Sequence, residues 1–274
     1  MKILTANIAL GVPNARSVWV SLRSLVAFHT WKIVPFLLLG GHSLGLFNYM
    51  SVATSKKRSE FFSKNTRLDN TLALIEGCEP DIVVLNEVLV QLHRPILDRE
   101  LLKMGFAHIA WGPSLHYPDM TVATMVASKL PCAESFIPQI SHLPEISGGA
   151  GAAGLRLRNV PLTLVGCHLT AGLRDFSRRQ MQDLSNVIES EKEKGRQTIC
   201  VGDFNETADT LLSRAPFKTE GLTSVSREPT CPLGLPSFMR KDLDHVFAPL
   251  SWTVKDARTI DFGSDHLALL AEVA

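Results

Sequence analysis

Apolar runs that end in a polar residue recur along this chain, and one of them organises the rest. In the stretch 199–207, Ile199–Val201 predict the end of a buried strand, and Gly202 allows a tight turn. Asp203 and Asn205 follow, and an extended backbone would point both side chains to the same side. Taken alone, this motif is more typical of an Asp/Asn turn, so the other runs decide between a turn and a cation site.

Five further predicted strands carry polar residues at one end. They are Lys2–Ile8 with Asn7, Asp81–Glu87, Leu162–Cys167 followed by His168, Leu243–Phe247 with Asp244, and Leu267–Val273 preceded by Asp265 and His266. Repetition on this scale indicates that the strands bring their ends to one rim of a sheet. The carboxylates, amides and imidazoles there could hold a divalent cation and leave histidine–carboxylate sets for proton handling. Ligation by oxygen favours Mg²⁺, Mn²⁺ or Ca²⁺ over Zn²⁺.

The rest of the pattern predicts alternating helices and strands. The helices are 68–77, Val90–Met104 and Asp175–Lys194; the other strands are Ala107–Trp111, Thr121–Ser128, a hairpin of Leu155–Arg158 with Leu162–Cys167, and Trp252–Ile260. The glycine-rich run Gly148–Gly154 is predicted to be a mobile or tight loop. It lacks the lysine and the spacing of phosphate-binding loops.

The segment 16–50 is predicted to be an apolar helical insertion, because its apolar residues recur at helical spacing until Pro35. We expect it to pack on the domain. The alternative is an amphipathic element that meets lipid or a partner, but an interfacial helix should be more basic on its polar face. The basic stretch that follows, Lys56–Arg58 with Lys64 and Arg67, is typical of a solvated face and could also meet phosphate.

Composition sets the outer limits. The 274 residues, 45% of them hydrophobic, suffice for one large α/β domain over 1–274. A formal net charge of +1 excludes a strongly basic field over the whole protein. Five cysteines without a Cys-x-x-Cys pair argue against a disulfide framework or structural zinc and predict a reducing compartment, the cytoplasm. No apolar run reaches the roughly 20 residues of a membrane helix.

The order of these motifs resembles the endonuclease/exonuclease/phosphatase superfamily. The motifs are Thr5-Ala-Asn7, Asp81–Glu87, Gly166-Cys-His168, Gly202-Asp-Phe-Asn205, Leu243-Asp244 and Ser264-Asp265-His266. That superfamily includes DNase I-like nucleases, apurinic endonucleases, inositol 5-phosphatases and neutral sphingomyelinases. The resemblance implies an α/β fold, a four-layer α/β/β/α sandwich of two packed mixed β-sheets flanked by helices, with the site at one edge.

The resemblance also implies a metal centre for Mg²⁺ or Mn²⁺. Glu87 resembles the principal metal ligand, with Asn7 beside it and Asp265 near the metal. Three positions depart from the common family pattern, one of which is His245, where an aromatic residue, often tyrosine, is common. Asn86 stands where many members have glutamine, and Ala9 stands where the nuclease branch often has aspartate.

The catalytic roles are implied in the same way. Asp203 is similar to the aspartate that orients or deprotonates the attacking water, and Asn205 helps to hold it and the phosphate. His266 resembles the histidine that contacts the scissile phosphate, with Asp244 as its orienting partner. His168 resembles a second histidine that stabilises the phosphate. Positive charge on the non-bridging oxygens and a positioned water are what a phosphodiester requires.

These motifs predict a metal-dependent phosphoesterase that hydrolyses a phosphodiester by direct attack of water. Nucleic acid is the favoured substrate by analogy with the family, and Arg174, Arg178 and Arg179 could track a phosphate backbone. A phospholipid or other small phosphodiester is the alternative, which the apolar 16–50 segment favours. A binding scaffold without catalysis is the second alternative. Monoester against diester preference, and endo against exo cleavage, stay open at this point.

Overall fold

The computed structural model describes residues 1–8, 66–117, 120–141, 151–170, 174–214, 217–218, 221–231, 240–264 and 266–274. The predicted insertion at 16–50, the basic cluster Lys56–Arg58 with Lys64, and Asp265 lie outside these ranges, so what was predicted for them stays a prediction. The same holds for the single-domain organisation over 1–274. No described helix is long and apolar enough to cross a membrane.

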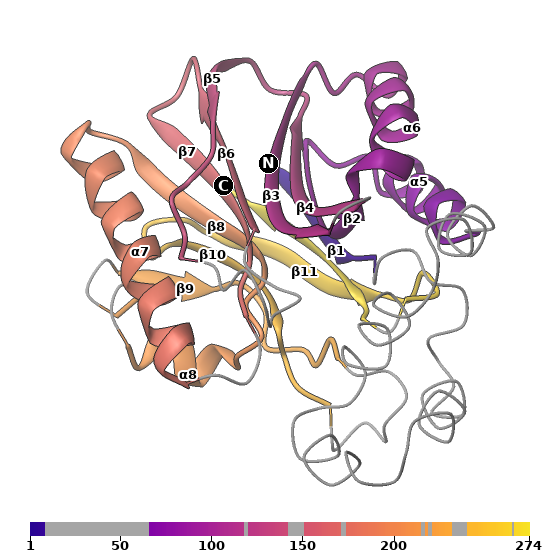
Figure 1. The fold of residues 1–274 in the computed structure, drawn as a ribbon. Coiled ribbons are helices and arrows are strands. Elements are labelled where there is room, and N and C mark those ends of the chain that lie inside the picture. Colours follow the sequence, from indigo (N-terminus) through magenta and orange to yellow (C-terminus); the bar gives the residue numbers. More distant parts are fainter. Residues whose placement is uncertain are drawn as a thin grey trace, which may run out of the picture.

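Two six-stranded mixed sheets form the centre of the protein (Figure 1). The first sheet has, in spatial order, β11 (Val254–Ile260), β12 (Ala268–Val273), β1 (Lys2–Asn7), β2 (Ile82–Leu89), β4 (Met120–Ser128) and β3 (His108–Tyr117). The second has β5 (Cys132–Phe136), β6 (Gly151–Leu157), β7 (Leu162–His168), β8 (Gln197–Asp203), β10 (Asp244–Pro249) and β9 (Leu222–Ser224). Each sheet contains one parallel pair, β1 with β2 and β7 with β8.

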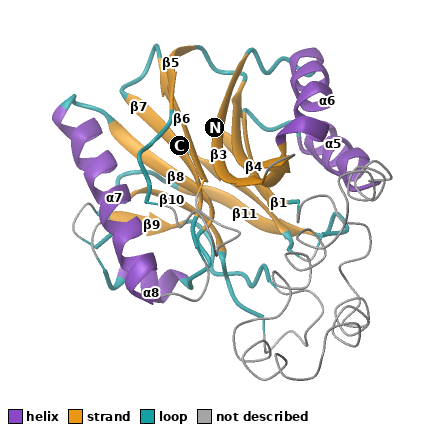
Figure 2. Cartoon of the chain, in the orientation of Figure 1, coloured by secondary structure: helices purple, strands orange, loops and turns teal. Residues whose placement is uncertain are grey.

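Helices cover the outer faces of both sheets (Figure 2). They are α5 (Thr66–Cys78) and α6 (Val90–Lys103) beside the first sheet, and α7 (Arg174–Glu193) and the short α8 (Ala208–Leu212) beside the second. Three buried apolar clusters fill the spaces between layers. The middle one joins the sheets, for example Val84 with Leu164, and the outer two hold Leu97 of α6 and Leu184 of α7. The predicted four-layer sandwich is therefore confirmed.

The two parallel pairs place the functional side chains. In each pair the chain leaves one strand at its carboxyl end and comes back through a helical segment to the same sheet. Asn7 at the end of β1 is the register partner of Asn86 in β2, and His168 at the end of β7 is the register partner of Asp203 in β8. Because the carboxyl ends of parallel strands meet at one edge, polar residues from distant stretches gather there.

The prediction of a loop over Gly148–Gly154 is wrong for the described part, because β6 begins at Gly151 and pairs with β7. The small residues serve close approach between the sheets. A Cβ atom on Gly112 of β3 would lie 1.9 Å from the backbone oxygen of Ala152 in β6. The run therefore reads as a loop by composition, while sheet packing makes it a strand. The other predicted helices and strands are present with shifted ends, and β5, β9 and α8 were not predicted.

Candidate active site

Asn7 joins the two sheets at their common edge. It is buried, and its Nδ2 donates to Glu87 Oε1 of the first sheet (3.2 Å) and to Asp203 Oδ2 of the second (2.9 Å). Its main-chain oxygen accepts a 2.7 Å hydrogen bond from the hydroxyl of the buried Ser264. The structure thus brings together two carboxylates that are 116 positions apart in the sequence (203 minus 87).

Glu87 lies on an irregularity in β2. The register between β2 and β4 shifts between Leu85 and Val88, so Asn86 and Glu87 face the single residue Thr124 as in a β-bulge. Glu87 has φ +58, a left-handed conformation that is uncommon for glutamate. The bulge aims this side chain at the site edge, where 23% of it is exposed.

Asp203 is almost fully enclosed, with 2% of its side chain exposed. Its Oδ1 accepts from the main-chain N–H of Asn205 (2.8 Å), in addition to the contact with Asn7. Gly202 before it has φ +137, and a Cβ there would lie 1.9 Å from the carbonyl oxygen of Cys167. Only glycine fits this position, so the Gly-Asp sequence follows from the packing of β8 against β7.

The expectation of an extended backbone from Asp203 to Asn205 is wrong. Asn205 has φ +53, and its Nδ2 donates to the carbonyl oxygen of Leu169 (2.8 Å). The side chain therefore ties the loop after β8 to the loop after β7. Asn205 holds Asp203 through its main chain, which is a turn geometry that Asp/Asn motifs favour.

His168 faces both carboxylates. Its Nε2 lies 3.7 Å from Asp203 Oδ2 and 3.9 Å from Glu87 Oε1. The ring is buried, and within the described part of the chain its Nδ1 has no hydrogen-bond partner. A histidine in this place can donate a hydrogen bond from Nε2 to an oxygen that enters between the carboxylates.

His266 and Asp244 form a hydrogen-bonded dyad, with 2.7 Å between His266 Nδ1 and Asp244 Oδ2. His266 Nδ1 also lies 3.9 Å from Asp203 Oδ2. Burial lowers the pKa of His266, but the Asp244 carboxylate and the Cys231 thiol raise this pKa by more, so it lies well above its ordinary value. These neighbours therefore favour the protonated form of His266 next to Asp203.

Asn86 belongs to the site, although sequence reasoning noted it only as a departure. Its amide orientation follows from its neighbours: the oxygen accepts from the N–H of Asp203 (2.8 Å), and the NH2 group donates to Cys167 O (3.2 Å) and Thr124 Oγ1 (3.1 Å). The side chain is fully buried. Asn86 therefore holds the end of β8 against β2, and no local sequence signal indicates these partners.

Thr230 is a second residue that sequence reasoning missed. Its buried hydroxyl accepts from the N–H groups of Leu243 and Asp244 (3.1 Å each). Its carbonyl oxygen accepts from the N–H of Leu267 (2.8 Å). Thr230 thus links the backbone of Asp244 to the segment that carries His266, and nothing in the sequence around position 230 marks it.

The donor set fits a hard divalent cation. Asp203, Asp244 and His266 place one donor atom each within 4.8 Å of one another. Asp244 and His266 are already paired, however, and within the described residues Asp203 makes no ion pair with lysine or arginine. Glu87 is the carboxylate with solvent access, and Mg²⁺ keeps several waters. Glu87, next to Asn7, is therefore the carboxylate of the site that could hold such an ion together with water.

Comparison with known proteins agrees with this fold. A model of the Endonuclease/Exonuclease/phosphatase family matches residues 59–266, and no curated protein sequence matches the chain. Three of the solved structures that are similar to this chain follow. The first is an endonuclease/exonuclease/phosphatase family protein from Leptotrichia buccalis (14% identity, TM-score 0.65, 100% of this chain and 99% of the other). The second is the human nocturnin catalytic domain with bound sulfate (18%, 0.59, 76% and 86%). The third is ANGEL2, a 2′,3′-cyclic phosphatase, in complex with adenosine-2′,3′-vanadate (14%, 0.62, 99% and 94%).

Proposed function

The chain belongs to the endonuclease/exonuclease/phosphatase family, and from this premise we propose that it hydrolyses a phosphodiester by direct attack of water. The observation that carries the proposal is the meeting of three groups from both sheets. Glu87 and Asp203 share the Asn7 amide, and the His266–Asp244 dyad lies within 3.9 Å of Asp203. A base, a cation-binding carboxylate and an imidazolium at one point are the parts that this reaction needs.

Each residue has a role that its contacts support. Asp203 accepts a proton from the attacking water, because Asn7 and the Asn205 N–H hold its two oxygens in place. His266, kept protonated by Asp244, donates to a non-bridging phosphoryl oxygen. His168, which lies beside Glu87 and Asp203, donates a hydrogen bond to the same phosphoryl group. No nucleophilic side chain is required: the water oxygen forms the new bond to phosphorus and stays on the product monoester, while the bond from phosphorus to the leaving oxygen breaks and this oxygen takes up a proton and departs as an alcohol.

Glu87 and Asn7 would hold Mg²⁺ or Mn²⁺, together with Asp265. When bound, such an ion supplies charge neutralisation on the phosphoryl oxygens and lowers the pKa of water. We favour a nucleic acid as the substrate. The alternative, a phospholipid, is favoured only by the apolar composition of the segment 16–50. All five cysteines are free thiols, which supports the proposal of the cytoplasm as compartment.

The test is hydrolysis of bis(p-nitrophenyl) phosphate against p-nitrophenyl phosphate, each with Mg²⁺, Mn²⁺ or EDTA. We expect the diester to be cleaved only with metal, and Asp203→Asn to lose about 10² to 10⁴ in kcat. Asp209→Asn is the matched control, since this carboxylate is 85% exposed on α8. Wild-type rates in Asp203→Asn would refute the assignment of the base. Preference for the monoester would instead indicate a phosphatase.

Metal binding has a separate readout that needs no turnover. Titration of MgCl₂ into the wild type by calorimetry should give one binding event that Glu87→Gln weakens at least tenfold. Glu76→Gln on the exposed face of α5 is the control and should bind like the wild type. Equal affinity in all three proteins would contradict the assignment of Glu87 as the ligand.

A further inference from the structure

The loop between β8 and α8 carries two of the proposed site residues, Asp203 at its start and Asn205 within it. Asn205 has φ +53, and such a left-handed backbone persists only where the surroundings hold it. Through this turn the main-chain N–H of Asn205 donates to Asp203 Oδ1 (2.8 Å). The contacts that hold the loop therefore help to decide where the Asp203 carboxylate points.

His245 contacts this loop on both sides of Asn205. Its Nε2 lies 2.9 Å from the carbonyl oxygen of Glu206. Its ring packs edge-on against the ring of Phe204, with 5.8 Å between the centroids and 60° between the planes. His245 is fully buried. Since Phe204 precedes Asn205 and Glu206 follows it, one imidazole holds the residues on either side of the left-handed position.

The imidazole of His245 acts here as a hydrogen-bond donor. A carbonyl oxygen only accepts, so Nε2 carries the hydrogen in this contact. Nδ1 is buried and has no hydrogen-bond partner within the described parts of the chain. The bond to the Glu206 carbonyl oxygen therefore orients the polar edge of the ring, while the ring of Phe247, 5.1 Å away between centroids, packs against it.

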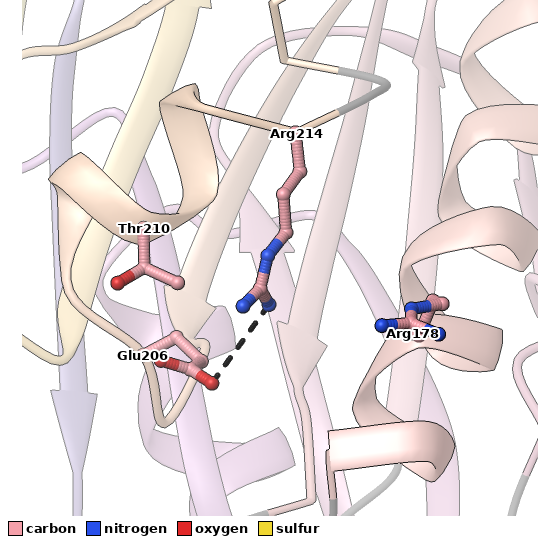
Figure 3. A pocket seen from close by; sticks show the side chains of 4 residues that line it. All are labelled: Arg178, Glu206, Thr210 and Arg214. Carbon is pink, nitrogen blue, oxygen red and sulfur yellow. Dashed lines mark ion pairs between the residues drawn. The ribbon is translucent and has the colours of Figure 1, made fainter.

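The side chain of Glu206 holds the loop less firmly than its carbonyl group does. In Figure 3 the Glu206 carboxylate points toward Arg214, 3.9 Å from its guanidinium, and the two side chains are 31% and 43% exposed. An exposed ion pair at this distance contributes little. Of these two attachments of Glu206, the buried hydrogen bond to His245 is therefore the firmer one.

Consecutive residues of β10 thus serve two halves of the site. Asp244 pairs with His266 (2.7 Å), whereas His245 points to the opposite face of the sheet, toward Phe204 and Phe247. The same strand that supplies the dyad carboxylate therefore also supplies the group that holds the loop after β8.

We propose that His245 is a positioning residue: by donating to the Glu206 carbonyl oxygen, it keeps the loop in the left-handed turn through which Asn205 orients Asp203. This inference rests on the proposed phosphodiesterase function and adds to it a residue that acts through the loop.

Two substitutions separate the hydrogen-bond donor from the ring. His245→Phe keeps an aromatic ring and removes the donor, whereas His245→Gln keeps an N–H donor the same number of bonds from Cβ and removes the ring. On bis(p-nitrophenyl) phosphate with Mg²⁺, kcat of His245→Phe should fall about 10- to 100-fold while KM stays within about twofold. His245→Gln should keep kcat within about threefold of the wild type.

Thermal stability should follow the opposite order. Phenylalanine fills the place between Phe204 and Phe247, but glutamine leaves a gap there, so Tm of His245→Gln should lie about 5 °C or more below that of His245→Phe. Ile188→Ala is the matched control, because Ile188 of α7 is buried in the same apolar cluster as these two rings. It should lower Tm and leave kcat within about twofold of the wild type. If kcat instead follows Tm through the two His245 variants, the ring serves packing alone and the inference is wrong.

Hydrogen exchange tests the same contact without turnover. Followed by mass spectrometry, the segment 203–208 should exchange at least about tenfold faster in His245→Phe than in the wild type or His245→Gln, because a released loop exposes the Asn205 N–H. Equal exchange in all three proteins would overturn the inference. Faster exchange with unchanged kcat would overturn it too, since the loop would then not position Asp203. If the wild type cleaves no phosphodiester, the proposed function fails, and the exchange rates still decide whether His245 holds the loop.

Discussion

Replacing Asn86 by alanine should destabilise the protein and slow its reaction together, because this side chain holds the catalytic strand in place. The substitution leaves two buried backbone groups without their side-chain partner, the N–H of Asp203 and the carbonyl oxygen of Cys167. Each unsatisfied group costs about 1–3 kcal/mol. Thr124 loses less, since its hydroxyl also donates to the Gly151 carbonyl oxygen. The free energy of unfolding should therefore fall by about 4 kcal/mol.

Thermal unfolding measures this loss directly. At about 2–4 °C per kcal/mol for a protein of this size, Tm should drop by roughly 10 °C. Activity on bis(p-nitrophenyl) phosphate should fall about 10- to 100-fold at a temperature where the variant is folded, because a displaced Asp203 misorients the water. Asn186→Ala on the exposed face of α7 is the control and should change neither quantity.

The result that would refute this reasoning is a Tm of Asn86→Ala within about 2 °C of the Asn186→Ala control. A large loss of Tm with full activity would refute only the second half, that Asn86 positions Asp203. Asn86→Gln distinguishes the effect of side-chain length from the effect of losing the amide group. It keeps the amide, so it should recover part of the stability if the bulge in β2 can shift to admit one more methylene.

Three further predictions concern stability. Burial lowers the pKa of His93 to about 4, below its unfolded value of about 6.5, so on acidification the unfolded chain binds a proton at His93 before the folded protein does. The free energy of unfolding, measured by urea titration, should therefore fall by about 3 kcal/mol between pH 6.5 and 4. His93→Gln should remove this contribution to the pH dependence. Glu191→Ala should cost about 2–3 kcal/mol in the same assay without a change in KM, because it removes the buried partner of the Arg156 guanidinium, which keeps only the exposed Glu134 carboxylate. Gly202→Ala should give no soluble folded protein on expression, while Gly195→Ala, which has open space around it, should fold and lose only about 1 kcal/mol.

The architecture could be predicted because periodicity reports burial. Strands such as β1 and β8 are short apolar runs with a polar residue at the end, so both their presence and the edge that they share follow from local sequence. The run beginning at Gly151 could not be predicted in this way. Its small residues reflect the approach of Gly112 on the other sheet, and that contact is invisible before the sheets are packed.

The same limit applies to the site. The gathering of Asn7, Glu87 and Asp203 was expected from strand ends, and the structure places them in contact. Asn86 was noted only because it stands where many family members have glutamine. Its role was not predicted, since its three partners lie on three other strands. Asn205 was expected to have an extended backbone. Its backbone is left-handed instead, so its main-chain N–H, and not its side-chain amide, donates to Asp203.

The position of β1 between β2 and β12 has a consequence for synthesis on the ribosome. Asn7 emerges early, but the strand that covers its other edge begins at Ala268, roughly 260 residues later. At about 5–20 residues per second, that edge waits some 13–52 s for its neighbour. During this time β1 presents unpaired N–H and C=O groups, which invite pairing with other chains. The dyad histidine His266 arrives with the same last segment, so a ribosome-bound chain stalled before position 266 should be inactive.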